Sequence, residues 1–344
     1  MTRLGLVVPM SGTLGMMGPA VLNCARLAAA ELNAAGGILH KPIDFVLVDA
    51  GRDPRTVAAD VLDLVRDKAI DAVIGTHASD ARVEIVRAIA GTVPYVFTPP
   101  YEGGETAPGV YLLGETPDRQ LRPVLQWLVE SRRARRWALI GNDYVWPRHL
   151  NRAARRYLRK ARVVAERYVP LGLTDPQPLV DLVAASRADA VLLTLVGSDL
   201  VTFNRAFADS RLGERVLRLC GALEENGLLG AGGDTSGELY AAMGYFGSVA
   251  TDSALAFLER YTHRYGWQAP VLNGHAEACY DGIRLLSALA ERAGSLAPAR
   301  LDATSDGTVI VGGRGQLTIR RRHADQAVFL ARADGLDFDI VRSF

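Results

Sequence analysis

Residues that could bind a small molecule follow several predicted β-strands along the chain. Met10–Gly15 follows the first strand, Thr76–Ser79 the third and Thr98–Gly103 the fourth. In the second half of the chain, Gly141–Arg148 and Val196–Asp199 follow later strands in the same way. Their hydroxyl, imidazole, carboxylate and aromatic side chains can form hydrogen bonds with a small polar molecule or stack on it. Because ligands bind at the carboxyl ends of strands in open α/β sheets, these segments favour recognition of a small solute.

The motifs of common enzymes and metal sites are absent. The chain has no P-loop, no G-x-G-x-x-G after its first strand, no H-E-x-x-H and no G-x-S-x-G. The six histidines are scattered, and Cys24, Cys220 and Cys279 have no C-x-x-C spacing, which excludes a zinc ribbon. We therefore expect no catalytic residue, no metal and no cofactor, and a binding protein rather than an enzyme.

Alternating strands and helices must position the strand-end segments. In the first half, the pattern predicts strands at 4–8, 43–49, 72–75, 95–97 and 110–113, and helices at 20–35, 53–68 and 79–90, the last with Ser79 as its N-cap. A second block predicts helices at 117–131, 148–160, 179–186 and 200–210, and strands at 137–141, 163–169, 190–195 and 216–219. The glycine-rich stretch 227–233 is expected to be a flexible loop.

After residue 246 the pattern changes. Two long helices are predicted at 253–265 and 273–293, followed by strands at 308–311, 316–320, 327–333 and 338–341. Alternation of this kind is typical of α/β proteins with doubly wound parallel sheets. We expect two such lobes, a chain that crosses between them more than once, and a ligand cleft between the lobes.

Composition limits the class of protein. The 344 residues include 39 Lys and Arg against 38 Asp and Glu, and this balance argues against a nucleic-acid binder. No apolar run reaches the roughly 18 residues needed to cross a bilayer. The chain enters its first strand at Leu4 without a signal-peptide core. We therefore expect a cytoplasmic protein; the alternative is a periplasmic or cell-surface protein from which a leader has been removed.

Four short motifs identify a family resemblance. They are Pro9-x-Ser11-Gly12, Glu31-Leu32-Asn33-x-x-Gly36-Gly37, Pro99-Pro100-Tyr101-Glu102-Gly103 and Asp143-Tyr144-x-x-Pro147-Arg148. Together they resemble the type I periplasmic binding proteins, and within them the branch of urea receptors and the short-chain amide sensor of the amidase operon. The collinear match runs from Arg3 to about Tyr280 and is weak after Gly294.

The resemblance implies which residues contact the solute. The loop after the third strand supplies a serine, matched by Ser79, and often an aromatic residue, where this chain has His77. The second lobe supplies two aromatic residues, matched by Tyr144 and Trp146. The full set of contacts implied in this way is His77, Ala78, Ser79, Phe97, Thr98, Pro99, Tyr144, Trp146, Gly197, Leu223 and Glu224.

The departures from the family pattern leave the solute open. Phe97 and Trp146 stand where relatives often have tyrosine, so hydroxyl groups that could pair with an amide or urea are lost. With His77, Asp199 and Glu224 near the cleft, an amine-bearing or more apolar solute is the alternative to an amide, urea or amino acid.

Two functions follow from the resemblance. The first is a solute sensor whose open or closed state is read by a regulator protein, and we favour it at this stage. The alternative is the binding component of an ABC importer, which would dock on a permease. Either function implies lobes at 1–117 with 249–322 and at 118–248 with 323–344. Direct nucleic-acid binding and membrane insertion are not expected, whereas a homodimer is compatible with both functions.

Overall fold

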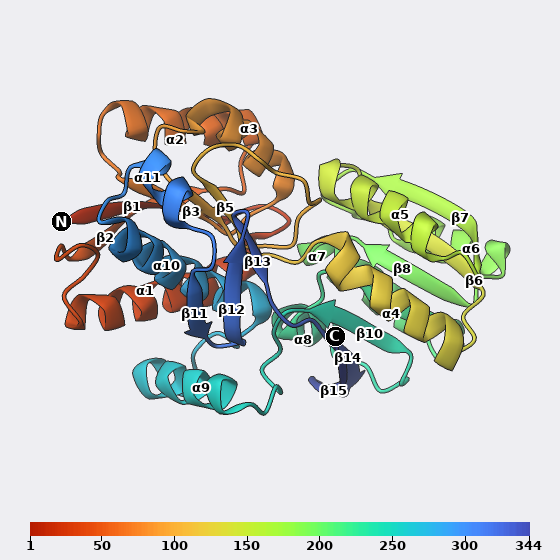
Figure 1. Cartoon of the computed structure of the whole chain (residues 1–344). Coiled ribbons are helices and arrows are strands. Elements are labelled where there is room, and N and C mark those ends of the chain that lie inside the picture. Colours follow the sequence, from red (N-terminus) through yellow and green to blue (C-terminus); the bar gives the residue numbers. More distant parts are fainter. The chain divides into compact units, whose positions relative to one another are not determined.

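The structure is a computed structural model that describes residues 1–344. The chain forms two compact units, each assembled from separate stretches: Met1–Gly114 with Ala250–Gln326, and Glu115–Val249 with Ala327–Phe344. The chain therefore passes from one unit to the other three times. Each unit contains one sheet flanked by helices (Figure 1). The expected α/β fold with two lobes of largely parallel sheets is confirmed.

The first unit is built on an eight-stranded sheet in the order β11-β12-β13-β5-β4-β3-β1-β2. Strands β1 to β5 are parallel, and the late strands β11 to β13 extend the sheet next to β5, as the red-to-orange and blue strands show in Figure 1. The strands are β1 (Thr2–Val8), β2 (Ile43–Asp49), β3 (Ala72–Gly75), β4 (Tyr95–Phe97), β5 (Val110–Leu112), β11 (Val309–Gly312), β12 (Gly315–Arg320) and β13 (His323–Asp325).

The helices of the first unit follow from local signals. Helix α2 begins where Asp53 accepts hydrogen bonds from the N–H groups of Arg55 and Thr56, with Pro54 as the first helical residue. Helix α10 begins with the same kind of cap from Asn273. The helices are α1 (Gly18–Ala34, after the short 3₁₀ turn Gly15–Met17), α2 (Pro54–Arg66), α3 (Ser79–Ile89), α9 (Asp252–Tyr265), α10 (Gly274–Ala293) and α11 (Pro298–Thr304).

The second unit has a seven-stranded sheet in the order β15-β14-β10-β9-β8-β6-β7. Strands β6 to β10 are parallel to one another, and β14 and β15 add an antiparallel edge next to β10. The strands are β6 (Arg136–Asn142), β7 (Arg162–Val169), β8 (Ala190–Thr194), β9 (Leu217–Cys220), β10 (Leu239–Met243), β14 (Phe329–Asp334) and β15 (Asp337–Ser343). The helices are α4 (Pro117–Ser131), α5 (Val145–Tyr157), α6 (Gln177–Ser186), α7 (Gly197–Ala208) and α8 (Glu225–Ala231).

Helices α8, α5 and α7 differ from the elements that the sequence predicts. The stretch expected as a flexible loop lies largely in helix α8, because Leu228 is buried and the left-handed Gly232 ends the helix one residue after Ala231. Helix α5 begins at Val145, three residues earlier than expected, since a proline is accommodated in a first helical turn. Helix α7 likewise begins at Gly197 rather than Leu200.

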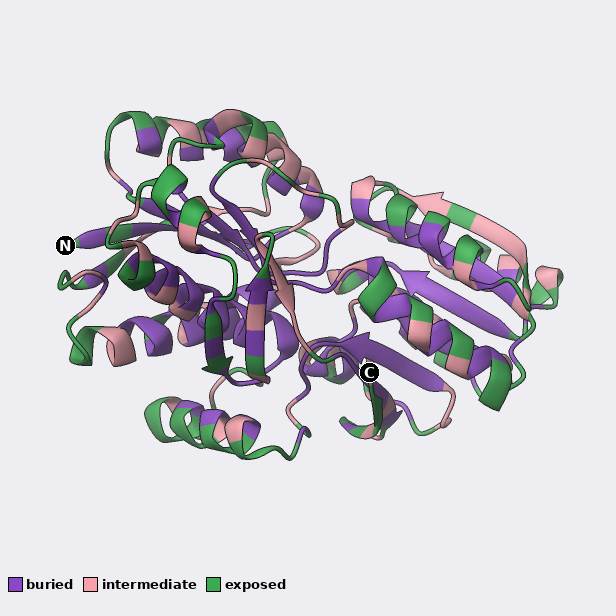
Figure 2. Ribbon diagram, viewed as in Figure 1, coloured by how far each residue is buried: buried purple, intermediate pink, exposed green.

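Each sheet carries its own core. Central strands such as β3 and β8 are buried along their whole length, and the helices bury the faces that pack on them (Figure 2). In the first unit, one cluster joins Val57 and Val61 of α2, Ile85 of α3, and the rings of Tyr95 and Phe97 from β4. All helices are too short or too polar to span a lipid bilayer.

Candidate functional site

The carboxyl edge of the first sheet brings two of the predicted segments together. Strands β3 and β4 are parallel neighbours, and Gly75 pairs with Phe97 at their carboxyl ends. The segments that follow them, 76–79 and 97–99, therefore leave the sheet side by side. The predicted contacts found at this edge are His77, Ala78, Ser79, Phe97, Thr98 and Pro99.

Ser79 presents two unused hydrogen-bond donors at this edge. It is the first residue of α3, and its N-cap is the extended Ala78, so the expectation that Ser79 caps the helix was wrong. The Asp80 carboxylate accepts the Ala81 N–H at 2.8 Å, and burial raises the pKa of Asp80. The Ser79 hydroxyl and N–H have no protein partner and lie at the positive end of the helix dipole.

His77 has both ring nitrogens engaged within the protein. Nδ1 lies 2.9 Å from the Ala78 carbonyl oxygen, which can only accept, so Nδ1 carries the proton. Nε2 then accepts from the Tyr95 hydroxyl at 3.0 Å. Burial lowers the pKa of His77 to about 4, which keeps the ring neutral at physiological pH. His77 therefore has no nitrogen free for a solute, and its ring supports the loop that carries Ser79.

Phe97 and Thr98 point to opposite faces of the sheet, as successive strand residues must. The Phe97 ring lies against His77, 5.3 Å between ring centroids, within the core cluster under α2 and α3. The Thr98 hydroxyl lies 2.7 Å from that of Thr76 and 3.2 Å from the Gly75 carbonyl oxygen. Both side chains are buried, so they shape the edge from within.

A buried ion cluster fixes α3 to the segment after β4. The Arg82 guanidinium donates to Glu102 at 2.7 Å and to Glu105 at 2.6 Å, and it lies 5.6 Å from the centre of the Phe97 ring. Burial alone would raise the pKa of Glu105, but the Ala107 N–H and the Arg82 charge lower it. Because α3 begins at Ser79, this cluster holds the helix start in place relative to β4.

The second sheet collects the remaining predicted residues at its carboxyl edge. Strands β6, β8 and β9 are parallel neighbours, and each is followed by one of the segments that the sequence singles out. The predicted contacts at this edge are Tyr144, Trp146, Gly197, Leu223 and Glu224. Leu223 is fully buried and Glu224 nearly so, whereas Tyr144 and Gly197 are half-buried.

Tyr144 and Trp146 lie at the start of α5 with different surroundings. Tyr144 is the extended N-cap residue of the helix. Trp146 is 3% exposed, and its buried indole Nε1 has no hydrogen-bond partner. The indole packs close to Gly221, which directly follows β9.

Asp199 is not free for a solute. Its carboxylate accepts from Asn142 Nδ2 at 2.7 Å and from the N–H groups of Gly172 at 3.0 Å and Leu173 at 2.9 Å. The Asn142 side-chain oxygen in turn accepts from the Val196 N–H at 2.9 Å. Asp199 therefore joins the ends of β6 and β8 to the loop after β7, and the suggestion that it meets the solute is not supported by this geometry.

Glu225 follows the implied contacts Leu223 and Glu224 and was not itself among the expected contacts. Its Oε1 accepts the Gly247 N–H at 2.6 Å, while its Oε2 is buried without a partner. Burial raises the pKa of Glu225 to about 8, so the side chain is a neutral acid at pH 7. The sequence could not predict its protonation state, because that depends on burial and on a residue 22 positions away.

We expect Glu225 to make the protein less stable as the pH rises. Its pKa is higher in the folded than in the unfolded chain, so only the folded state holds the proton between about pH 4.5 and 8. In that window it lowers the free energy of unfolding by up to about 1.4 kcal/mol per pH unit. Urea denaturation of wild type and Glu225→Gln from pH 5 to 8 measures the effect. Equal pH slopes for the two proteins would contradict it.

The remaining titratable groups do not form a metal site. No group of three or more His, Cys, Asp or Glu side chains is arranged to bind a metal ion. The three cysteines are buried thiols in separate elements, and burial raises the pKa of Cys220 and of Cys279 to about 12. The first edge thus offers the donors of Ser79 and the second edge the rings of Tyr144 and Trp146, and these groups suit binding of an organic molecule.

Comparison with known proteins gives a family match over almost the whole chain. The profile of the family described as "Periplasmic binding protein" matches residues 2–337. The match therefore includes the region after Gly294, where the sequence motifs gave only a weak resemblance.

Solved structures share this fold at low sequence identity. A leucine binding protein, LivK, from Thermotoga maritima has 19% identity and a TM-score of 0.86, covering 100% of this chain and 99% of its own. An ABC transporter solute binding protein from R. palustris, solved with 4-hydroxybenzoate, has 19% identity and a TM-score of 0.87, covering 100% and 96%. LivJ from Streptococcus pneumoniae, solved with isoleucine, has 21% identity and a TM-score of 0.85, covering 99% and 98%.

Proposed function

The chain belongs to the periplasmic binding protein family, and from this premise we propose that it is the solute-binding component of an ABC importer for a small carboxylate with an apolar body. The observation that carries the proposal is the free pair of donors on Ser79 at the start of α3. A carboxylate is the group that such a helix start favours, because it accepts two hydrogen bonds and complements the helix dipole.

The named relatives support a carboxylate. Leucine, isoleucine and 4-hydroxybenzoate, the molecules named with the similar structures, each carry a carboxylate and an apolar or aromatic body. An amide or urea fits less well, since Phe97 and Trp146 offer no hydroxyl for paired hydrogen bonds. The urea and amide branch that the sequence motifs resemble is therefore the second candidate for the solute.

The importer role is favoured over the sensor role. The relatives named with a transporter, such as the 4-hydroxybenzoate binding protein, are transport proteins. An importer component acts outside the cytoplasmic membrane and delivers its solute to a membrane permease, so we propose an exported location and a permease partner. This replaces the cytoplasmic sensor that the sequence alone favoured.

In the proposed mechanism, the carboxylate of the solute binds Ser79 and the first turn of α3. In the second unit, Tyr144 and Trp146 are the aromatic side chains on which an apolar body could stack. We propose Glu224 as the acidic group that would meet an amino group, where the solute has one.

Ser79→Ala tests the proposal with the least disturbance. Alanine removes the hydroxyl, which has no protein partner, so we expect unchanged stability but a loss of about 1–3 kcal/mol of solute binding. Tyr144→Ala should also weaken binding without unfolding the protein. Calorimetric titration with leucine, isoleucine and 4-hydroxybenzoate measures both effects. Wild-type affinity in a well-folded Ser79→Ala protein would remove Ser79 from the site.

A further inference from the structure

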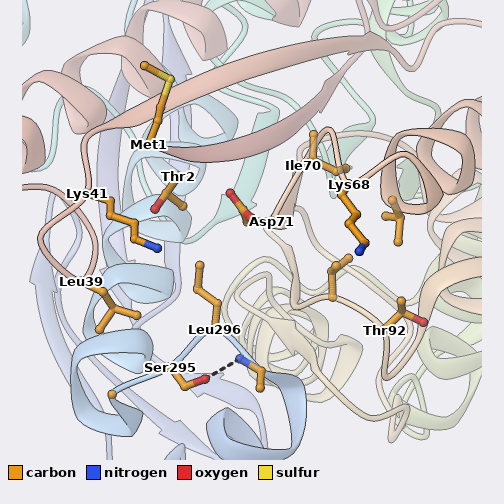
Figure 3. Close-up of a pocket in the computed structure, with 14 residues that line it drawn as sticks. Met1, Thr2, Leu39, Lys41, Lys68, Ile70, Asp71, Thr92, Ser295 and Leu296 are labelled. Carbon is orange, nitrogen blue, oxygen red and sulfur yellow. Dashed lines mark hydrogen bonds between the residues drawn. The ribbon is translucent and has the colours of Figure 1, made fainter.

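A pocket opens at the amino edge of the first sheet, opposite the edge that carries Ser79. It has a volume of about 690 Å³ and is lined by the residues that precede β1, β3 and β4 together with the loop between α10 and α11 (Figure 3). It is separate from the edge that carries Ser79, because β3 runs from the pocket residues Ile70 and Asp71 at one end to the Thr76–Ser79 segment at the other.

Two of the three lysines of the chain line this pocket. Lys41 and Lys68 are in its wall, whereas 36 of the 39 basic residues of the chain are arginines. Both lysine side chains are exposed at the mouth of the pocket. Neither ammonium group has a carboxylate within 4.0 Å, while Lys160, the third lysine, pairs with Glu130 at 3.1 Å.

The two lysines lie on segments that lead into strands two positions apart in the sheet. Lys41 precedes β2 and Lys68 precedes β3, and β1 lies between these strands. Two strand spacings amount to about 10 Å. Figure 3 shows the two ammonium groups on opposite sides of the pocket, with Asp71 and Leu296 between them. The Asp71 carboxylate accepts the Arg3 N–H at 2.8 Å.

Apolar side chains line the pocket beside Asp71. Val93 and Leu296 are half-buried, whereas Ile70 and Val65 are 3% and 9% exposed. A ligand that spans the pocket would therefore contact Leu296 and Asp71 in its middle and a cation at each end.

We propose that this pocket binds a dicarboxylate, with one carboxylate on Lys41 and the other on Lys68. Each ammonium donates to one carboxylate, and the hydrocarbon body packs on Ile70 and Leu296. A hydroxyl group in the middle of the ligand could donate to Asp71. This site goes beyond the proposed solute site, and neither depends on the other.

Helix stabilisation explains only one of the two lysines. Lys68 follows the end of α2 at Arg66, where a cation complements the helix dipole. It takes a left-handed conformation there, with φ of 53°, which favours glycine. Lys41 lies in the loop before β2 and not in a final helical turn, so a role in capping does not account for it.

The test compares dicarboxylates with monocarboxylates of matched length. Calorimetric titrations with succinate, glutarate, adipate and pimelate, and with butyrate to heptanoate as singly charged partners, should show tighter binding of at least one dicarboxylate. Lys41→Gln and Lys68→Gln should each weaken that dicarboxylate about tenfold, and Lys160→Gln should leave it unchanged. Ser79→Ala should also leave it unchanged, which separates this site from the solute site.

Lysine NMR identifies the site directly because the chain has only three lysines. After reductive ¹³C-methylation, which keeps the charge, Lys41→Arg, Lys68→Arg and Lys160→Arg assign the three signals. Addition of the dicarboxylate should shift the Lys41 and Lys68 signals and not the Lys160 signal. No dicarboxylate binding at millimolar concentration, or binding that both glutamine variants retain in full, would overturn the proposal.

Discussion

Replacing Arg82 with leucine is expected to lower the free energy of unfolding by about 3–5 kcal/mol, because it leaves two carboxylates without their buried cation. The Arg82 side chain is 6% exposed, and Glu102 and Glu105 are 6% and 17% exposed. Leucine cannot donate to either carboxylate, and its loss of contact with the Phe97 ring adds to the effect.

Arg87→Leu is the matched control for this prediction. It lies on the same helix, is 68% exposed and pairs with Glu84 at 2.7 Å, three residues earlier. Exposed pairs of this kind contribute at most about 1 kcal/mol. Chemical denaturation of both variants measures the difference. Adding Glu102→Gln and Glu105→Gln to Arg82→Leu should restore part of the stability, and equal losses for the two arginine variants would contradict the role of the cluster.

Replacing Asp199 with alanine is expected to lower the free energy of unfolding by about 1–3 kcal/mol, because the buried Asn142 amide and two N–H groups of the loop after β7 lose their acceptor. These donors are Asn142 Nδ2 and the N–H groups of Gly172 and Leu173. The end of β6 would then lose its connection to the loop after β7, and that loop should become more susceptible to proteolysis.

Asp143→Ala is the control from the neighbouring segment. Asp143 is exposed and pairs with Arg148 at 2.6 Å, and the hydrogen bond from Arg148 lowers the pKa of its carboxyl group. Its removal should leave the stability close to that of the wild type, because exposed ion pairs contribute little. If the Asp199 and Asp143 variants melt at the same temperature, the hydrogen bonds of Asp199 do not stabilise the fold as predicted.

The sequence predicts most of the fold because the signals for its elements are local. The strand bounds 43–49, 72–75 and 95–97 and the helix bounds 117–131 agree with the structure. In each case an apolar run lies between turn or capping residues. Helix α8 was missed because Gly227 and Gly230 within it are typical of loops, and only the burial of Leu228 reveals the helix.

The candidate site is predicted less completely, because the sequence places residues but not their partners. The strand-end rule brings His77 and Ser79 to one sheet edge, yet it cannot tell that His77 is engaged by Tyr95 and that Ser79 is not. The same holds for Asp199, whose partners Gly172 and Leu173 come from another loop. Contacts with distant segments occupy the polar atoms of His77 and Asp199, and these contacts can be seen only in the structure.

The motifs that suggest the amide and urea branch serve largely as internal contacts. Glu102 pairs with Arg82, and the Tyr101 hydroxyl hydrogen bonds to His323. The Tyr280 hydroxyl donates to Glu31, the first residue of the Glu31–Gly37 motif, so this motif also makes a contact within the fold. Motif residues that stabilise the fold are shared by proteins with this fold whatever solute they bind. The motifs therefore identify the family more securely than the ligand.

Thermal unfolding in the presence of acids and of their own amides distinguishes a carboxylate site from an amide site. Leucine, isoleucine and 4-hydroxybenzoate are compared with leucinamide, isoleucinamide and 4-hydroxybenzamide, with urea and acetamide beside them. A bound solute stabilises the folded state, by about 2.7 kcal/mol at a hundredfold excess over its dissociation constant. We expect at least one acid to raise the melting temperature while its amide does not, and Ser79→Ala to reduce the shift. A shift with urea or an amide but with none of the acids would contradict the carboxylate site.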